Sequence, residues 1–246
     1  MSNSRPIWTG FFSTREAAVE ACKTDGTLWS NPRWLMRQGG ISGEGAYIDS
    51  WQSLPRPTTL PLLTSSRALG TVVDFGGSSG WVYQRCLDLG ARLEKYVVVE
   101  VPPVVAQFAP TAPERVVYVT AEDSHKCFDT SVDILYSNAT LQYLNSLDEF
   151  LSLIISSRPR TILIDELLWT RNHDDWFSVQ TNSDRLMVVR FVSFARLKDD
   201  LQRLGYRLGW SQGTLAADTR MAMPDMSHLP EELRINARLS ACFLAC

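Results

Sequence analysis

Hydrophobic residues gather in short runs along the chain from Thr71 onward, and stretches with apolar positions at helical spacing separate these runs. The runs are rich in Val, Ile, Leu and Tyr and predict buried strands of a parallel sheet. These strands are expected at 71–75, 96–100, 115–119, 132–137 and 160–166. Helices are expected at 80–89, 102–108, 146–156 and 193–204. Because strands and helices alternate with short connections, the pattern predicts an α/β fold.

Residues 1–70 have a different texture, with many Trp, Ser, Pro and Gly residues and little strand character. Ser13 and Glu16 have the spacing of a capping box, so a helix is expected to begin there. A second short helix is expected within 31–40, which opens with Asn-Pro and closes with Gly-Gly. We interpret 1–70 as a helical cap or lid on a main domain at 71–246.

The segment 167–190 interrupts the alternation and shows no clear periodicity. A stretch of roughly two dozen irregular residues in a compact domain usually forms a functional loop or lid. This segment contains His173, one of three histidines in the chain, and histidine is the side chain that titrates near neutral pH. The segment therefore offers a candidate base, although His173 could also be a surface residue on a flexible loop.

Composition narrows the range of partners. The 246 residues suit one α/β domain with a modest N-terminal addition, and 45% of them are hydrophobic, which suffices for a full core. A net charge of −3 with scattered Lys and Arg disfavours nucleic acid. The five cysteines include no C-x-x-C pair, so no metal site is expected. We expect these cysteines to be reduced thiols of a cytoplasmic protein. No signal peptide and no run of about eighteen apolar residues is found, so no membrane contact is expected, and a homodimer is left open.

Segment 71–80 carries the strongest chemical signal. Its buried strand leads into Asp74 and then into a glycine-rich turn that opens a helix, so that backbone N–H groups are directed at one place. The glycines of the turn are Gly76, Gly77 and Gly80. Glu100 ends the next strand, where a nucleotide-binding fold of this kind places a ribose-binding carboxylate.

The glycine spacing argues against a dinucleotide. The fingerprint G-x-G-x-x-G fits no register here, because Trp81 and Val82 occupy the place of its last glycine. A carboxylate at Asp74 would also repel a pyrophosphate, whereas it could accept hydrogen bonds from an ammonium group. A cationic amino-acid ligand therefore fits better than a nicotinamide cofactor or a nucleotide sugar.

Asp74 to Gly80 resembles the first motif of class I S-adenosylmethionine-dependent methyltransferases, and Glu100 resembles the acid that ends their second strand and holds both ribose hydroxyls. Ser78 stands where that motif usually has a glycine. The resemblance implies S-adenosylmethionine as the cofactor and a Rossmann-like, doubly wound, mostly parallel seven-stranded sheet with an antiparallel last strand. Strands at 207–211 and 238–245 would then form an antiparallel hairpin at the sheet edge.

The wider pattern is similar to a group of poorly characterised bacterial methyltransferases, often encoded near polysaccharide or secondary-metabolite genes. The segments that carry this likeness are Trp8 to Phe12 with the helix after it, Asp74 to Gly80 with Tyr83, Leu141 to Leu144, Thr161 to Glu166, His173-Asp174 with Gln180, and Leu204 to Tyr206. The likeness implies a biosynthetic methyltransferase but points to no particular acceptor. We prefer a small metabolite or sugar-linked acceptor, over which the aromatic cap could close, with O-methylation. Two rivals stay open: a protein that uses bound S-adenosylmethionine for cyclisation, elimination or structure, and a non-catalytic binding subunit.

Related enzymes also contact the cofactor at the ends of the third and fourth strands. Glu122 or Asp123 lies where such enzymes place an acid or amide against the adenine amino group, although either could instead cap a helix in a solvated loop. Ser137 and Asn138 occupy the stretch that passes beneath the methionine part and faces the acceptor, although they could form only a polar turn.

The acceptor decides whether a base is needed, because methyl transfer from a sulfonium depends mostly on holding the acceptor atom close and aligned in a dry cavity. For a hydroxyl acceptor we predict His173 as the base, whereas a carboxylate acceptor needs none. The residues expected to orient or bind the acceptor are Asn138, Gln142, Tyr143, Trp169 and Gln180, although Tyr143 could simply be core. Asp165 and Glu166 end the fifth strand and could position an acceptor or only cap the sheet. Aromatic residues of the cap could close over a ring-shaped acceptor or anchor the cap, namely Trp29, Trp34, Tyr47 and Trp51.

Overall fold

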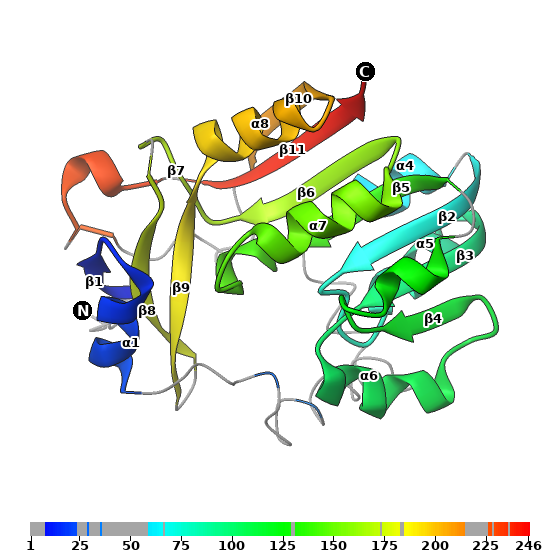
Figure 1. Ribbon diagram of the computed structural model, residues 1–246, viewed down its shortest axis with the longest axis horizontal. Coiled ribbons are helices and arrows are strands. Elements are labelled where there is room, and N and C mark those ends of the chain that lie inside the picture. The colour runs from blue at the N-terminus through cyan, green and yellow to red at the C-terminus, as the bar shows by residue number, and fades with distance from the viewer. Residues whose placement is uncertain are drawn as a thin grey trace.

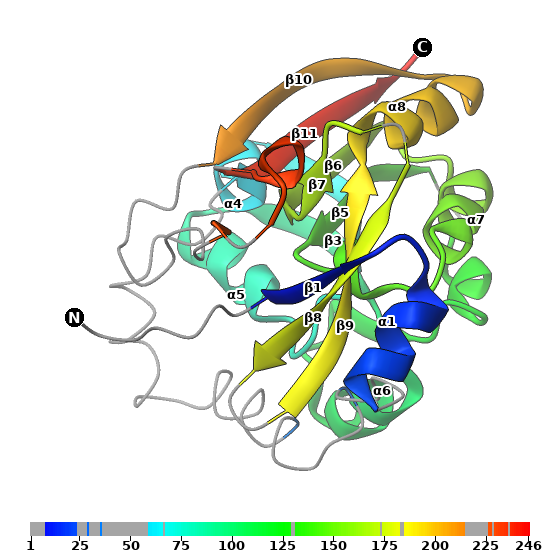
Figure 2. The same cartoon turned by 90° about the vertical axis from the view of Figure 1, so that its left-hand side faces the viewer.

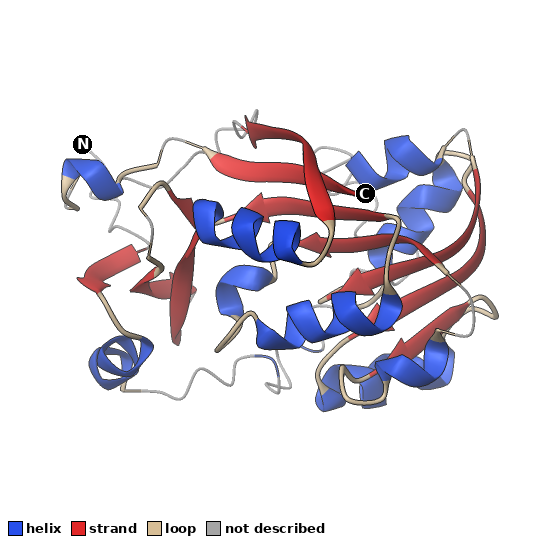
Figure 3. Ribbon diagram, turned by 45° about the horizontal axis from the view of Figure 1, so that its top comes forward, coloured by secondary structure: helices blue, strands red, loops and turns tan. Residues whose placement is uncertain are grey.

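The structure is a computed structural model in which the strands form two sheets (Figures 1 and 3). It describes residues 8–23, 29, 35, 59–65, 67–128, 131–172, 174–182, 185–214, 226–227, 229–235 and 237–246. The larger sheet has seven strands and the smaller has four. Within these ranges, no helix has both the length and the apolar character needed to span a membrane.

The seven-stranded sheet confirms the predicted fold. Its order is β10-β11-β6-β5-β2-β3-β4, and β11 is the one strand of this sheet that runs in the direction opposite to the other six. The strands are β2 (Ala68–Phe75), β3 (Arg92–Val99), β4 (Val116–Val119), β5 (Val132–Asn138), β6 (Thr161–Leu167), β10 (Tyr206–Thr214) and β11 (Arg238–Ala245). The expected hairpin is confirmed at the β10 edge. The strand order reverses between β2 and β5, which is the switch point where open α/β sheets bind ligands.

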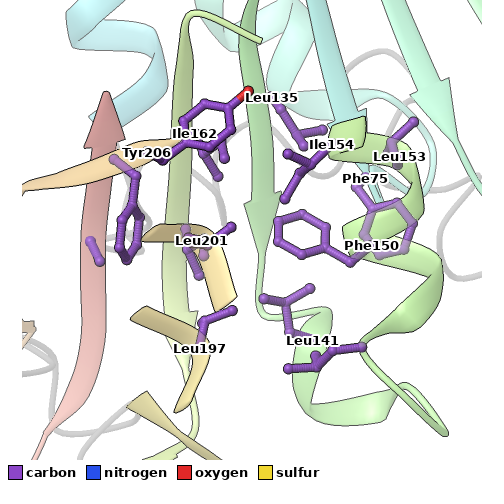
Figure 4. Close-up of a cluster of buried hydrophobic side chains, with 14 of the residues drawn as sticks. Phe75, Leu135, Leu141, Phe150, Leu153, Ile154, Ile162, Leu197, Leu201 and Tyr206 are labelled. Carbon is purple, nitrogen blue, oxygen red and sulfur yellow. The ribbon is translucent and has the colours of Figure 1, made fainter. Parts of the chain in front are cut away.

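Helices cover both faces of this sheet. On one face, Phe150 and Ile154 of α7 and Leu197 of α8 pack against strand residues such as Ile162 (Figure 4). On the other face, α4, α5 and α6 contribute Leu60, Val82, Tyr83, Cys86, Val104 and Phe108. The helices are α4 (Thr59–Thr64), α5 (Trp81–Asp88), α6 (Pro102–Phe108), α7 (Asp148–Ser157) and α8 (Phe194–Arg203), with short 3-10 turns η2 (Ala109–Thr111), η3 (Ser124–Cys127), η4 (Leu141–Tyr143) and η5 (Glu231–Leu233).

The four-stranded sheet corrects two expectations. Its order is β1-β8-β9-β7, with β1 (Trp8–Phe12), β7 (Trp169–Thr170), β8 (Trp176–Asn182) and β9 (Arg185–Ser193). Most described residues of segment 167–190 therefore lie in strands rather than in a loop, because β8 pairs with a strand that is far away in the sequence. That partner is β1, which lies in the region expected to have little strand character and which pairs antiparallel with β8. Helix α1 (Arg15–Cys22) lies against β8 and β9 (Figure 2).

The first helix starts slightly later than predicted. Thr14, and not Ser13, is the N-cap of α1, and its side-chain oxygen accepts a hydrogen bond of 3.3 Å from the backbone N–H of Ala17. Glu16 then falls one position short of the place that closes a capping box. The helix expected within 31–40 lies outside the described residues except for Leu35, and the domain division at residue 70 stays a prediction.

Candidate active site

The glycine turn after β2 is shaped by both backbone conformation and close packing. Gly76 has φ +77, and a Cβ there would lie 2.2 Å from the Thr140 hydroxyl oxygen. Gly80 has φ +70, and a Cβ there would lie 2.6 Å from the Tyr118 hydroxyl. Side chains from two other strand ends therefore close around the turn, so glycine is needed at both positions.

Asp74 lies directly beneath this turn. Its side chain is 1% exposed, and its Oδ2 accepts a hydrogen bond of 2.7 Å from the Tyr96 hydroxyl. A Cβ on Gly77 would lie 2.4 Å from the same oxygen, so the carboxyl group contacts the turn from below. Burial raises the pKa of Asp74 to about 7, the Tyr96 hydrogen bond opposes the rise, and the charge of Glu100 adds to it. Asp74 thus supports the turn, and its contact with an ammonium group stays a prediction.

Glu100 is tied to the turn by backbone hydrogen bonds. One carboxylate oxygen accepts from the N–H of Ser78 and the other from the N–H of Val101, both at 2.9 Å. Burial raises the pKa of Glu100, while these two backbone donors lower it. Ser78 has φ +53, a left-handed conformation that is uncommon for a residue with a side chain, and this conformation aims its N–H at Glu100. The predicted pairing of turn and strand-end acid is therefore present.

The two acids after β4 lie in an exposed loop. Asp123 forms an ion pair of 2.6 Å with Lys126, and this hydrogen bond lowers the pKa of Asp123. The backbone carbonyl of Glu122 lies 2.9 Å from Nδ1 of His125. Asp123 thus has local partners, as expected of a residue at a helix start, and the adenine contact of both acids stays a prediction.

Four buried polar atoms near the ends of β2 and β5 have no hydrogen-bond partner in the described structure. They are Ser79 Oγ, Ser137 Oγ, Asn138 Oδ1 and Gln142 Oε1. Buried polar groups in folded proteins are nearly always paired, so these atoms call for a ligand or water. Together with the turn that no Cβ could enter, they fit a polar nucleoside ligand bound at this end of the sheet.

The structure brings two predicted acceptor residues together. Gln180 on β8 accepts a hydrogen bond of 3.3 Å from the Trp8 indole and forms a side-chain hydrogen bond with Tyr143. Tyr143 packs edge to face on Trp29 at 5.0 Å between ring centroids. Burial raises the pKa of Tyr143, while the charge of Arg238 and the Gln180 hydrogen bond lower it. The small sheet therefore meets η4, which follows β5 of the large sheet, at these side chains.

Other candidates have structural partners or lie outside the described residues. The Trp169 indole donates to the carbonyl of Ala237 at 3.0 Å, and its ring packs on Phe194. Asp165 is 1% exposed and accepts from Thr59 at 3.4 Å and from a tyrosine of β5, so it anchors α4 to the sheet. His173 lies outside the described residues.

Sequence analysis missed the side chains that enclose the turn. Tyr96 could have been found, because it lies two residues from Val98, the register partner of Asp74, and so shares a face with that acid. Thr140 carries no such signal, since its contact with Gly76 exists only once β5 lies beside β2.

The fold is shared with known methyltransferases. No protein-family model and no curated protein matches the chain. A Haloferax volcanii methyltransferase solved with the Trm112 methyltransferase activator has a TM-score of 0.51 at 15% identity, over 87% of this chain and 94% of that one. An S-adenosylmethionine-dependent methyltransferase from Listeria monocytogenes has a TM-score of 0.51 at 13% identity, over 73% and 92%. The CcbJ methyltransferase from Streptomyces caelestis has a TM-score of 0.50 at 16% identity, over 78% and 91%. The chain thus has the fold of S-adenosylmethionine-dependent methyltransferases.

Proposed function

We propose that this protein is an S-adenosylmethionine-dependent methyltransferase that methylates a hydroxyl group of a small metabolite or sugar-linked acceptor. One observation carries the proposal: the carboxylate of Glu100 is held by the N–H of Ser78 and is thereby locked beside the glycine turn. Each carboxylate oxygen can accept a further hydrogen bond, which suits the two hydroxyls of a ribose. The fold, which is that of S-adenosylmethionine-dependent methyltransferases, supports the same assignment.

The residues of the crevice would hold the cofactor mainly by shape and hydrogen bonding. The turn from Gly76 to Gly80 would lie against the amino-acid part, Glu100 would bind the ribose, and Ser137 would meet the methionine end. Bound S-adenosylmethionine supplies a methyl group on a positively charged sulfur. The protein's own contribution is to align the acceptor atom and to exclude water, which supplies much of the rate in such a displacement.

The acceptor would lie between the two sheets. Asn138, Tyr143 and Gln180 would orient it, with His173 as the base for a hydroxyl. The proposal extends to the group of bacterial methyltransferases encoded near polysaccharide or secondary-metabolite genes, and to a cytoplasmic location.

Calorimetry with S-adenosylmethionine, S-adenosylhomocysteine and NAD tests the cofactor. We expect micromolar dissociation constants for the first two, about −8 kcal/mol, and no binding of NAD. Replacing Glu100→Gln removes a charged acceptor and should weaken binding about thirtyfold, equivalent to ~2 kcal/mol. Glu94→Gln, an exposed acid on β3, the strand that Glu100 directly follows, is the matched control and should change nothing.

Tight NAD binding, or equal affinity of the Glu100 and Glu94 variants, contradicts the assignment. The two rivals are separated by product analysis. Formation of S-adenosylhomocysteine together with a methylated compound indicates transfer, whereas cofactor that stays intact through turnover of an acceptor indicates a structural or electrostatic role.

A further inference from the structure

Segment 137–143 lies between the glycine turn after β2 and the ion pair formed by Glu166 and Arg238. Thr140 packs against Gly76 of the turn. Two residues later, Gln142 donates from Nε2 to the backbone carbonyl of Glu166 at 3.3 Å. Because β6 is the second neighbour of β2 in the sheet, Glu166 lies about 10 Å from the turn, within reach of a molecule bound beside the cofactor.

The ion pair joins the ends of two strands. Arg238, at the start of β11, lies 3.3 Å from the carboxylate of Glu166, just before the end of β6, and their side chains are 27% and 13% exposed. Both charges act on the hydroxyl of Tyr143. The pair therefore belongs to the same polar cluster as the predicted acceptor residues, and it is electrically neutral as a whole.

Backbone strain concentrates at the same edge of the sheet. Non-glycine residues with positive φ in the described structure include two helix C-caps, Lys23 and Arg158. The other three lie at the carboxyl ends of β2, β5 and β6 and are Ser78, Ala139 and Glu166, with φ +53, +52 and +53. Strain of this kind persists at binding sites because the surrounding structure holds it there.

A buried oxygen beside the pair lacks a partner. Gln142 is 1% exposed, and its Oε1 has no hydrogen bond. Its orientation is fixed, because Nε2 must face the Glu166 carbonyl, which can only accept. Oε1 therefore needs a donor from outside, and so does the buried Oδ1 of Asn138.

We propose that Glu166 is a further acceptor-binding residue: its carboxylate and Gln142 Oε1 accept hydrogen bonds from a methyl acceptor whose reactive group carries a proton, and Arg238 positions the carboxylate. This inference rests on the proposed function. It names the substrate class as alcohols or amines and excludes carboxylates, because an ionised carboxylate has no proton to offer three oxygen acceptors.

Binding of matched fragments to the protein loaded with S-adenosylhomocysteine tests this. Benzyl alcohol, benzylamine and benzoate share a ring and differ in the group presented, and each is titrated by saturation-transfer NMR. Fragments of this size bind with dissociation constants of about 1 mM when their polar group is satisfied. We expect the alcohol or the amine to bind at least about tenfold more tightly than benzoate. Tighter binding of the amine, which is protonated near neutral pH, also supports the site; methylation at nitrogen would additionally require that this group lose a proton.

Variants separate recognition from structural support. Glu166→Gln should weaken the alcohol about tenfold and leave the affinity for S-adenosylhomocysteine unchanged within about twofold. Arg238→Met should have a similar effect and Arg238→Lys should restore part of the affinity. The double variant Glu166→Arg with Arg238→Glu restores an ion pair, but its carboxylate then lies on β11 instead of β6. Stability should therefore recover, whereas fragment binding should not. Glu232→Gln, an exposed acid in η5, is the control.

Several outcomes overturn the inference. One is benzoate binding as well as the alcohol or the amine; another is wild-type affinity in Glu166→Gln; a third is recovered fragment binding in the double variant, which makes the pair purely structural. If neither alcohol nor amine binds at concentrations up to about 10 mM, the site is also wrong. Failure of the wild type to bind S-adenosylhomocysteine removes the proposed function itself, a result distinct from each of these.

Discussion

The two sheets differ in how far apart along the chain their paired strands lie. In the large sheet, β2 to β6 follow one another and most pairs join close neighbours in the sequence. In the small sheet, Trp8 pairs with Gln180, 172 residues away. The small sheet thus combines the N-terminal strand β1 with three strands, β7 to β9, that lie between β6 and α8 in the sequence. It is complete only when β1 has come together with β8.

The interiors of the two sheets also differ. The large sheet buries mainly Val, Ile and Leu between its helices. The small sheet buries stacked rings, with Trp176 on Phe191 at 3.7 Å between centroids, and a cation, Arg190, 5.4 Å from the ring of Phe177. Burial lowers the pKa of Arg190, and nearby Asp175 opposes this shift. We infer that the turn after β2 and Glu100 form a cofactor-facing layer, whereas the small sheet and the ends of β6 and β11 form an acceptor-facing layer, so changes in one layer should spare the ligand of the other.

The largest expected effect comes from filling the turn of the large sheet. Gly76→Ala adds both a left-handed alanine and a clash with Thr140, and it should lower the free energy of unfolding by about 5 kcal/mol. Gly205→Ala is the matched control, because it has φ +89 but no atom within 4 Å of its Cβ, and it should lose only ~1 kcal/mol. Urea unfolding measures both. Equal losses would mean that Thr140 does not close on the turn.

The next effect concerns the pH dependence of stability. The pKa of Asp74 is about 7 in the folded protein against an ordinary value of 3.8, mainly because of burial. The folded state therefore keeps a proton that the unfolded state has lost, so the contribution of Asp74 is full below pH 3.8 and is lost as the pH rises toward 7. Asp74→Asn cannot ionise and should gain about 4 kcal/mol relative to the wild type between pH 4 and pH 8.

Urea titrations of both proteins across this range measure the difference, with the exposed Asp199→Asn as the control. Parallel curves for the wild type and Asp74→Asn would show that the carboxyl group is solvated. Glu100 and Asp165 add slopes of the same sign in both proteins, because burial also raises their pKa values.

The contrast between the sheets also explains what the sequence could predict. The strands of the large sheet are continuous runs such as Tyr96 to Val99, buried on both faces, and the turn at Gly76 follows from local backbone requirements. In the structure, β2 begins three residues and β3 four residues before the predicted starts. The first residues of both strands are mostly exposed or only partly buried and are less apolar, so the apolar pattern does not mark them. These features depend on residues that are close together in the chain, so they can be predicted from the sequence alone.

The small sheet was mistaken for a loop for the opposite reason. β8 alternates weakly, and its buried Ser178 donates to backbone carbonyls of β1, including that of Gly10, a contact that no local pattern reveals. A signal was nevertheless present in β9, where the run Leu-Met-Val-Val-Arg-Phe-Val is typical of a strand. The contacts of Glu166 with Arg238 and Gln142 were likewise out of reach, because they join three separate segments.

A smaller effect is expected where the two sheets meet. Gln180→Leu removes the hydrogen bonds to Trp8 and Tyr143 and should lower the free energy of unfolding by about 1 kcal/mol. It should weaken binding of an alcohol fragment and leave the affinity for S-adenosylhomocysteine within about twofold of the wild type. Gln180→Glu keeps an acceptor for the indole and is the control. A matching loss of cofactor affinity would show that the two layers are not separate.

The smallest effect separates backbone from side chain at Ser78. Ser78→Gly removes the strain of a serine in the left-handed conformation, but it also raises the conformational entropy of the unfolded chain. Because these contributions nearly cancel, the free energy of unfolding should change by less than about 0.5 kcal/mol. Ser78→Val keeps the same N–H but places a β-branched side chain at φ +53, which should cost about 2 kcal/mol. Because the backbone N–H that holds Glu100 persists in both, cofactor affinity measured by calorimetry should fall only in the valine variant, where the turn itself is displaced. If the glycine variant loses affinity as well, the serine side chain binds the cofactor, and the turn recognises its ligand through more than its backbone.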